Sequence, residues 1–176
     1  LPAIMNQVEY FGRGPAENYL DRNAGSMIGL YKSTAEELYF PYVRPQENGH
    51  HTDTRWVSLS TGKKGLLIQA DNTIGFNALR NSIEDFDDEE ATGLPRQWSN
   101  FTPEQVANHD EAAAKNVLRR QHHINDITPR DFVEVCVDLK QQGVAGYDSW
   151  GSRPEPAYTL PANREYNWGF TLIPLK

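Results

Sequence analysis

The amino-acid sequence predicts an all-β fold that carries one or two short helices. Three observations lead to this prediction: short segments alternate apolar and polar residues with the period of a strand, β-branched and aromatic residues are concentrated in those segments, and turn-forming residues separate them. The 13 glycines and 11 prolines suit many turns and short strands. A chain of 176 residues can bury about 70% of its unfolded surface, and we expect a single domain over residues 1–176.

The first three strands are expected within residues 4–11, 38–43 and 52–59. The first of these ends at Gly12-Arg13-Gly14-Pro15, which we interpret as a turn between two strands. Pro41 has no backbone N–H, so it confines the second segment to a sheet edge or a bulge. The third segment alternates apolar and polar residues and therefore predicts a strand with one buried face.

The next two strands, residues 65–70 and 73–79, are separated by Asp71-Asn72, which we interpret as a tight hairpin turn. Further strands are expected later in the chain, at residues 116–124, 131–139, 157–160 and 165–173. In the last of them, aromatic residues occupy every second position, at Tyr166, Trp168 and Phe170. That spacing predicts a strand with one buried aromatic face.

Two short helices are expected between these strands. Residues 82–90 begin with Ser82 and place Asp85 three positions later, which is the spacing of a capping box, and more acidic residues follow. Residues 103–108 begin with Pro103, and the first turn is the place where a helix tolerates proline. The rest of the chain is predicted to be strands and turns.

Charge and cysteine content exclude several classes of function. The formal net charge is −7, and a chain without a basic stripe is not expected to bind nucleic acid or an anionic membrane surface. No apolar run approaches the ~20 residues of a membrane-spanning helix. Cys136 is the single cysteine and lies in an apolar segment, so we expect a buried structural thiol and no internal disulfide.

No residue pattern predicts a catalytic, metal or cofactor site in this chain. The six acidic residues within residues 84–90 lack the glycine and the alternating ligands of a calcium loop, and we interpret them as a solvated helix face. Neighbouring residues of a strand point to opposite faces, so His50-His51 and His122-His123 are not expected to chelate one metal ion. No spacing of carboxylates singles out the pair that glycoside hydrolysis needs.

Residues 143–151 are the segment that most suggests a binding function. Three glycines bracket the polar and aromatic run from Tyr147 to Trp150. The flat face of Trp150 can pack on the C–H face of a pyranose ring while Asp148 and Ser149 form hydrogen bonds nearby. In the alternative interpretation, Trp150 folds back as a lid on the end of a sandwich. The residues alone do not decide between the two.

Three segments, taken in order, resemble one known family. They are residues 12–22 (GRGPAENYLDR), residues 41–56 with PYVRPQENG and TDTRW, and residues 143–151 (GVAGYDSWG). Together they resemble the C-terminal small-chain domain (domain 5) of the large β-galactosidases of glycoside hydrolase family two, and the likeness spans nearly the whole chain. The sequence departs from the family at Tyr147, where the loop commonly carries an Asp, and at residues 91–114, which we interpret as an insertion.

This resemblance implies an antiparallel β-supersandwich similar to that of galactose mutarotases. It also implies a non-catalytic, truncated piece of a β-galactosidase that hydrolyses terminal β-D-galactosides such as lactose. The catalytic glutamates and any Mg and Na ions would belong to a TIM-barrel domain elsewhere in the same polypeptide. Trp150 would contact the galactoside at the mouth of the pocket, and this chain alone would be inactive. An incomplete sandwich also exposes an edge, which favours pairing between copies as a homo-oligomer.

Residues 44–49 allow two interpretations. Glu47 and Asn48 either support a turn, which the neighbouring proline and glycine favour, or line the same cleft as Trp150 and Asp148. The function of the whole chain also has alternatives: a freestanding carbohydrate-binding module, a mutarotase-like epimerase with a glutamate base and a histidine acid, or a purely structural or oligomerising domain.

Overall fold

The computed structural model describes residues 1–43, 46–86, 124, 127–148 and 150–176. The chain divides into two compact units. The first, which we call the sheet unit, comprises Leu1–Phe40, Asn48–Ser82 and Pro129–Lys176, and the second comprises Pro41–Glu47 and Ile83–Thr128. The single domain over residues 1–176 stays a prediction.

Several expected features lie outside the described residues. These are the helix at 103–108, the insertion at 91–114, and the strand at 116–124 apart from Ile124. Of the helix expected at 82–90, the described part is the single-turn 3-10 helix η1 (Ile83–Phe86), in which Asp85 is buried. The description of these acidic residues as a solvated face is therefore wrong for Asp85.

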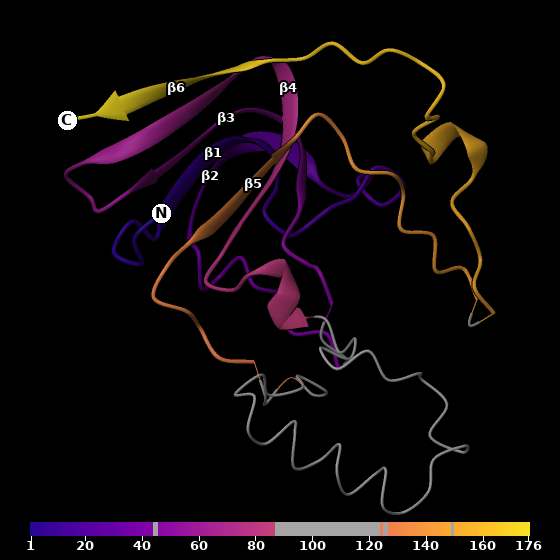
Figure 1. Ribbon diagram of the computed structural model, residues 1–176, viewed down its shortest axis with the longest axis horizontal. Helices are drawn as coiled ribbons and strands as arrows, with labels where there is room; N and C mark the ends of the chain where they lie inside the picture. The colour runs from indigo at the N-terminus through magenta and orange to yellow at the C-terminus, as the bar shows by residue number, and fades with distance from the viewer. Residues whose placement is uncertain (44–45, 87–123, 125–126, 149) are drawn as a thin grey trace, which may run out of the picture. The chain divides into compact units, whose positions relative to one another are not determined.

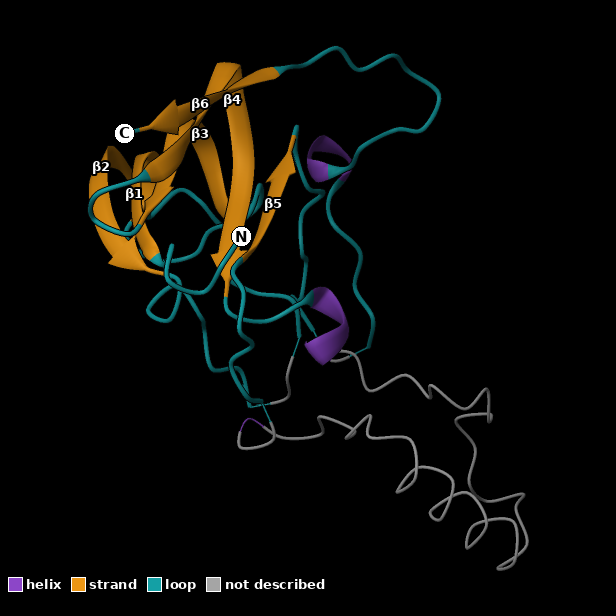
Figure 2. Cartoon of the chain, turned by 60° about the vertical axis from the view of Figure 1, so that its left-hand side comes forward, coloured by secondary structure: helices purple, strands orange, loops and turns teal. Residues whose placement is uncertain are grey.

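All six described strands belong to one antiparallel sheet, which confirms the all-β prediction (Figures 1 and 2). The strand order is β2-β1-β3-β4-β5, and β6 also pairs with β4. The strands are β1 (Gln7–Gly14), β2 (Met27–Thr34), β3 (His51–Ser60), β4 (Gly65–Leu79), β5 (Glu134–Asp138) and β6 (Phe170–Leu175). The 3-10 helix η4 (Pro156–Tyr158) lies in the long connection that leaves the sheet after β5 and returns to it at β6 (Figure 1).

The interpretation of residues 12–15 as a turn is wrong, because β1 continues through Gly14. Glycine at position 12 allows β1 to lie close to Thr54 on the neighbouring strand, because a Cβ at Gly12 would lie 2.4 Å from Oγ1 of Thr54. The adjacent strand β2 has no counterpart among the expected strands. It is an edge strand, and its exposed apolar residues, such as Met27 and Leu30, give it no one-sided pattern.

The hairpin expected at Asp71-Asn72 is also wrong. Residues 65–79 form one long strand, β4, whose register with β3 shifts between Gln69 and Ile74. Neither Asp71 nor Asn72 has the positive φ that a two-residue hairpin turn requires. Instead, β4 exchanges partners there, because its first half pairs with β6 and its second half with β5.

Three further segments differ from expectation. Residues 38–43 form no strand, as Pro41 and the turn before it interrupt the backbone pattern, and residues 156–158 form the 3-10 helix η4, led by a proline. The last strand begins only at Phe170, and its aromatic face is exposed rather than buried: Tyr166 is 36%, Trp168 45% and Phe170 39% exposed. Within the described residues, no second layer of the sheet unit covers that face.

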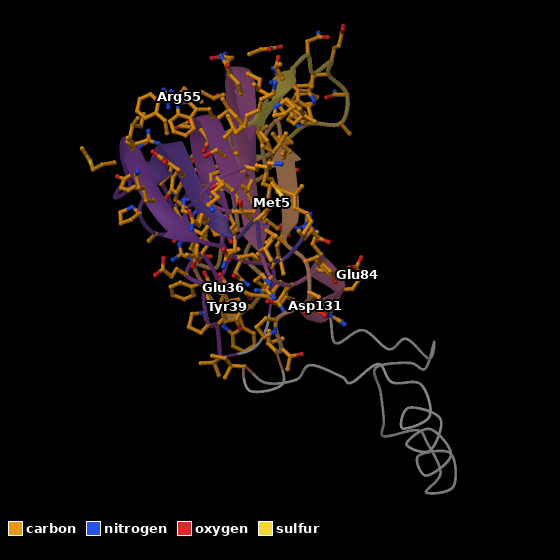
Figure 3. The ribbon with its side chains drawn as sticks, turned by 90° about the vertical axis from the view of Figure 1, so that its left-hand side faces the viewer. Met5, Glu36, Tyr39, Arg55, Glu84 and Asp131 are labelled. Carbon is orange, nitrogen blue, oxygen red and sulfur yellow. The ribbon has the colours of Figure 1, made fainter. Side chains whose placement is uncertain are left out.

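The core lies on one face of the sheet. Its largest fully buried apolar side chains come from three neighbouring strands, β1, β3 and β4, and from the residue that precedes β5: Val8, Tyr10, Val57, Leu59, Ile74, Phe76, Val133. At one end of the strands, Arg80 forms an ion pair with Glu36 at 2.6 Å, and Figure 3 shows Glu36 and Tyr39 at that end and Arg55 toward the other.

We expect Phe76→Ala to lower the free energy of unfolding by about 3–5 kcal/mol, because it removes a fully buried ring from the centre of the core. Phe11→Ala is the matched control, since that ring is 36% exposed on the opposite face, and it should cost less than half as much. Urea denaturation of both variants measures the difference. Equal losses would contradict this assignment of the core.

Candidate functional site

Trp150 stands out from the described surface of the sheet unit. Its side chain is 93% exposed, so it does not fold back as a lid. The local backbone holds this residue: Oδ1 of Asp148 accepts a hydrogen bond from the Trp150 N–H at 2.7 Å. Asp148 therefore shapes the turn that presents the indole, and its neighbour Ser149 lies outside the described residues.

The loop that carries Trp150 is fastened at its start. Both carboxylate oxygens of Asp21 accept backbone hydrogen bonds, Oδ1 from the Val144 N–H at 3.0 Å and Oδ2 from the Ala145 N–H at 2.8 Å. The Gly143 N–H donates to the carbonyl of Tyr158 at 2.8 Å. The loop is thus tied on one side to residues 12–22 and on the other to η4.

Positive φ angles bend the loop on both sides of the tryptophan. Ala145 has a φ of 54°, Gly146 of 81° and Gly151 of 83°. Two of the three positions are glycines, which adopt this conformation without steric cost. The Tyr147 N–H donates to Oγ of Ser152 at 3.1 Å across the bend. The glycines permit two of these bends, and the hydrogen bonds of the loop support the third, at Ala145.

Asn18 holds the segment that carries Asp21. Its side chain is fully buried and makes four hydrogen bonds: it donates to the carbonyls of Arg13 and Ala16, and it accepts from the N–H and the Oγ1 of Thr52. The backbone N–H of Asn18 also donates to the carbonyl of His50 at 2.7 Å. Residues 12–22 are thereby fixed against the start of β3.

An ion pair and a hydrogen bond to a carboxylate add to this anchoring. The guanidinium of Arg13 lies 2.5 Å from Oδ2 of Asp53, and Oε2 of Glu17 accepts a hydrogen bond from the Gly49 N–H at 2.7 Å. Arg13 and Glu17 belong to the first of the three recognised segments, and Gly49 and Asp53 belong to the second. The carboxylate of Asp21 joins the first segment to the third. Residues 12–22 therefore hold both Gly49 and Asp53 of the second segment and the start of the third.

The remaining candidate residues lie elsewhere. Asn48 is 1% exposed, and its Oδ1 accepts a hydrogen bond from the Phe40 N–H at 2.9 Å, as expected of a residue that supports a turn. Glu47 is exposed and belongs to the second unit. Cys136 is half-buried in β5 rather than fully buried. The structure brings Asp148 and Trp150 together, but it does not bring Asn48 to them.

The two histidines at the start of β3 are buried. His50 stacks on Tyr19 at a ring distance of 5.7 Å, and His51 packs between Tyr10 and Phe76. Nδ1 of His51 lies 3.1 Å from the carbonyl of Arg13, so this nitrogen carries the proton. Burial lowers the pKa of both histidines to about 4, and for His50 the neighbouring His51 adds to the effect. Both rings are neutral at pH 7.

A small cavity of about 70 Å³ borders His50, Asp53 and Gln141. Ligand pockets for small molecules usually enclose roughly 300–1,000 Å³, so this cavity is too small for a sugar. Among the described residues, no group of three or more His, Cys, Asp or Glu side chains is arranged to hold a metal ion. Nor does this part of the chain contain a helix of the length and apolarity needed to cross a membrane.

Sequence reasoning did not single out Asp21 or Asn18. Both lie within residues 12–22, which the resemblance marked as a whole without assigning roles to its members. The available signal was the set of three polar side chains, Glu17, Asn18 and Asp21, in a segment that follows a strand. The partners that tie these side chains to the rest of the fold, Thr52, Gly49, Val144 and Ala145, lie in other parts of the chain, and no local pattern identifies them.

Comparison with known proteins gives consistent matches. The family model described as Beta galactosidase small chain matches residues 1–172. The β-galactosidase of Priestia megaterium (strain DSM 319 / IMG 1521) is 34% identical over 174 residues, which cover 98% of this chain and 14% of that protein. The β-galactosidase of Lactobacillus delbrueckii subsp. bulgaricus is 29% identical over 175 residues, covering 99% of this chain and 14% of that protein.

A third relative, the β-galactosidase of Vibrio cholerae serotype O1 (strain ATCC 39541 / Classical Ogawa 395 / O395), is 28% identical over 172 residues, with 98% of this chain and 13% of that protein covered. The chain thus spans about one seventh of the length of these curated relatives, which are 13–14% covered.

The buried histidines predict a pH-dependent stability. Above pH 6.5 both are neutral in the folded and the unfolded chain, so protonation contributes nothing. Between pH 6.5 and about 4, only the unfolded chain binds these protons, and the free energy of unfolding should fall by about 1.4 kcal/mol per pH unit for each histidine.

Urea denaturation at pH 7, 6 and 5 measures this loss. The variant His50→Phe removes one of the two titrations, so its slope between pH 6 and 5 should be about half that of the unmodified chain. An unchanged slope would show that another group is responsible.

Proposed function

The chain belongs to the β-galactosidase small-chain family, and we propose that it forms the non-catalytic C-terminal part of a larger β-galactosidase. The whole protein would hydrolyse terminal β-D-galactosides such as lactose by a retaining double displacement. The two carboxylates of that reaction, and any Mg and Na ions, would lie in a TIM-barrel domain elsewhere in the polypeptide. This part would supply one aromatic contact, Trp150, to the substrate.

The exposure of Trp150 on a fastened loop carries this proposal. An indole that is 93% exposed gains nothing from the core of the sheet unit, so its burial is left for a partner surface. The ties at Gly143 and Asp21 order the loop in advance, which reduces the entropy lost when a ligand is bound. The flat, electron-rich face of an indole suits the C–H face of a galactoside.

The same geometry explains why this part would not act alone. A sugar stacked on Trp150 would meet only one aromatic platform and the short loop around it. Binding sites usually enclose most of a small ligand, and the cavity beside the loop base measures only about 70 Å³. The other walls of the pocket would come from the rest of the polypeptide.

In the full-length protein, Trp150→Ala should lower kcat/KM for lactose by about 10- to 100-fold, which corresponds to about 1.4–2.8 kcal/mol of lost stacking and burial. Trp150→Phe keeps a flat ring and should retain most of the activity. Trp56→Phe, in the sheet, controls for general effects of removing an indole. Steady-state kinetics with unchanged kcat and KM for Trp150→Ala would refute the role of this residue.

Titration of the isolated 176-residue chain with lactose and with galactose separates this proposal from a freestanding binding module. We expect no saturable binding up to about 1 mM ligand, because a single platform leaves most of the sugar in water. Circular dichroism of the same sample controls for folding. Saturable binding below that concentration would favour the module instead.

A further inference from the structure

We propose that Asp21 is a positioning residue for Trp150: its carboxylate clamps the start of the loop and so fixes where the indole is presented. This inference rests on the proposed function for its effect on activity. The clamp itself is a statement about the loop, and it can be tested separately.

The Asp21 carboxylate forms hydrogen bonds with the start of the loop. Its two oxygens accept from two consecutive backbone N–H groups, Oδ1 from Val144 at 3.0 Å and Oδ2 from Ala145 at 2.8 Å. Successive N–H groups at a bend form a concave site for an anion, and bonds to a charged acceptor are roughly twice as strong as neutral ones. Asparagine would accept only one of the two, because its amide nitrogen is a donor.

Gly143 and the carboxylate of Asp21 are in close contact. Gly143 is buried, and a Cβ built on it would lie 2.6 Å from Cγ and from Oδ2 of Asp21 and 3.0 Å from Cβ of Tyr158. Any larger residue would therefore push the carboxylate away from the loop. The contact of Asp21 with the loop therefore requires glycine at position 143, although 122 positions separate the two residues in the sequence.

The segment that carries Asp21 is itself held in place by hydrogen bonds and stacking. Asp21 lies in a turn closed by the hydrogen bond from the Arg22 N–H to the carbonyl of Tyr19 at 2.8 Å. Tyr19 is 6% exposed and stacks on His50, and Asn18 ties the same segment to β3. A clamp positions its target only if it is itself fixed, and this one is attached to the sheet.

A short stretch of chain connects the residues that Asp21 holds to the indole of Trp150. Val144 and Ala145 precede Trp150 by only five or six residues, and positive φ angles at Ala145 and Gly146 set the direction of the chain between them. The hydrogen bond from the Trp150 N–H to Asp148 then closes the turn at the tip. Without the Asp21 carboxylate, this bend loses the two hydrogen bonds that tie it to the sheet unit.

The test compares Asp21→Ala, Asp21→Asn and Gly143→Ala in the full-length protein. Hydrogen exchange of the backbone amides in residues 144–150 reports on the clamp directly. We expect exchange at Val144 and Ala145 to rise at least about tenfold in Asp21→Ala and Gly143→Ala, and less in Asp21→Asn. Asp131→Ala, which removes an exposed carboxylate of the sheet unit, should change nothing. Unchanged exchange at Val144 and Ala145 in Asp21→Ala would overturn the proposal.

A double-mutant cycle on kcat/KM separates positioning from a merely structural effect. Asp21→Ala should lower kcat/KM about 5- to 20-fold in the unmodified protein and less than twofold in the Trp150→Ala background, because its effect passes through the indole. An equal loss in both backgrounds would refute the role in positioning. If Trp150→Ala alone changes nothing, the proposed function fails, and amide exchange still decides whether Asp21 orders the loop.

Discussion

The buried side-chain amide of Asn18 is the constraint on which the candidate site depends. A primary amide offers two donors and one carbonyl oxygen with two acceptor positions, and all four are used here, on Arg13, Ala16 and Thr52. Leaving such groups buried without partners costs about 1–3 kcal/mol each. An aspartate at this position would lack the donors, and a leucine would satisfy none of the backbone groups. Together with the Arg13–Asp53 ion pair and the hydrogen bond from Gly49 to Glu17, this side chain holds the path of the chain after β1.

From that path, the site follows as a chain of attachments. Asn18 fixes the segment to β3, the same segment presents Asp21, and Asp21 holds the loop that ends in Trp150. Residues 12–22, Gly49 and Asp53 of the second resembling segment, and the start of the third at residues 143–145 are therefore neighbours in space. Two of them serve mainly to hold the third. Such a division suits a part that would lend a single contact to a pocket built elsewhere.

The sequence predicted the parts of the structure that local patterns specify. Alternation identified β3, an apolar run identified β5, and glycine spacing identified the loop that presents Trp150. It failed where longer-range contacts decide. Asp71-Asn72 resembles a turn, but pairing on both sides keeps β4 continuous. Tyr166, Trp168 and Phe170 alternate as a buried face does, but β6 begins only at Phe170 and no described layer of the sheet unit covers these rings. Local patterns could not predict the role of Asp21, because its partners lie more than 120 positions away in the sequence.

That separation has a kinetic consequence. The contact between Asp21 and the loop closes 123–124 residues of chain, and contacts of such length form late, since their closure entropy is repaid only after the intervening strands have paired. The geometry around Trp150 is thus expected to form only after strands between the two segments have paired. By the same logic it is among the first features lost when an edge of the sheet opens, so that the order of the loop around Trp150 reports on the integrity of the whole sheet unit.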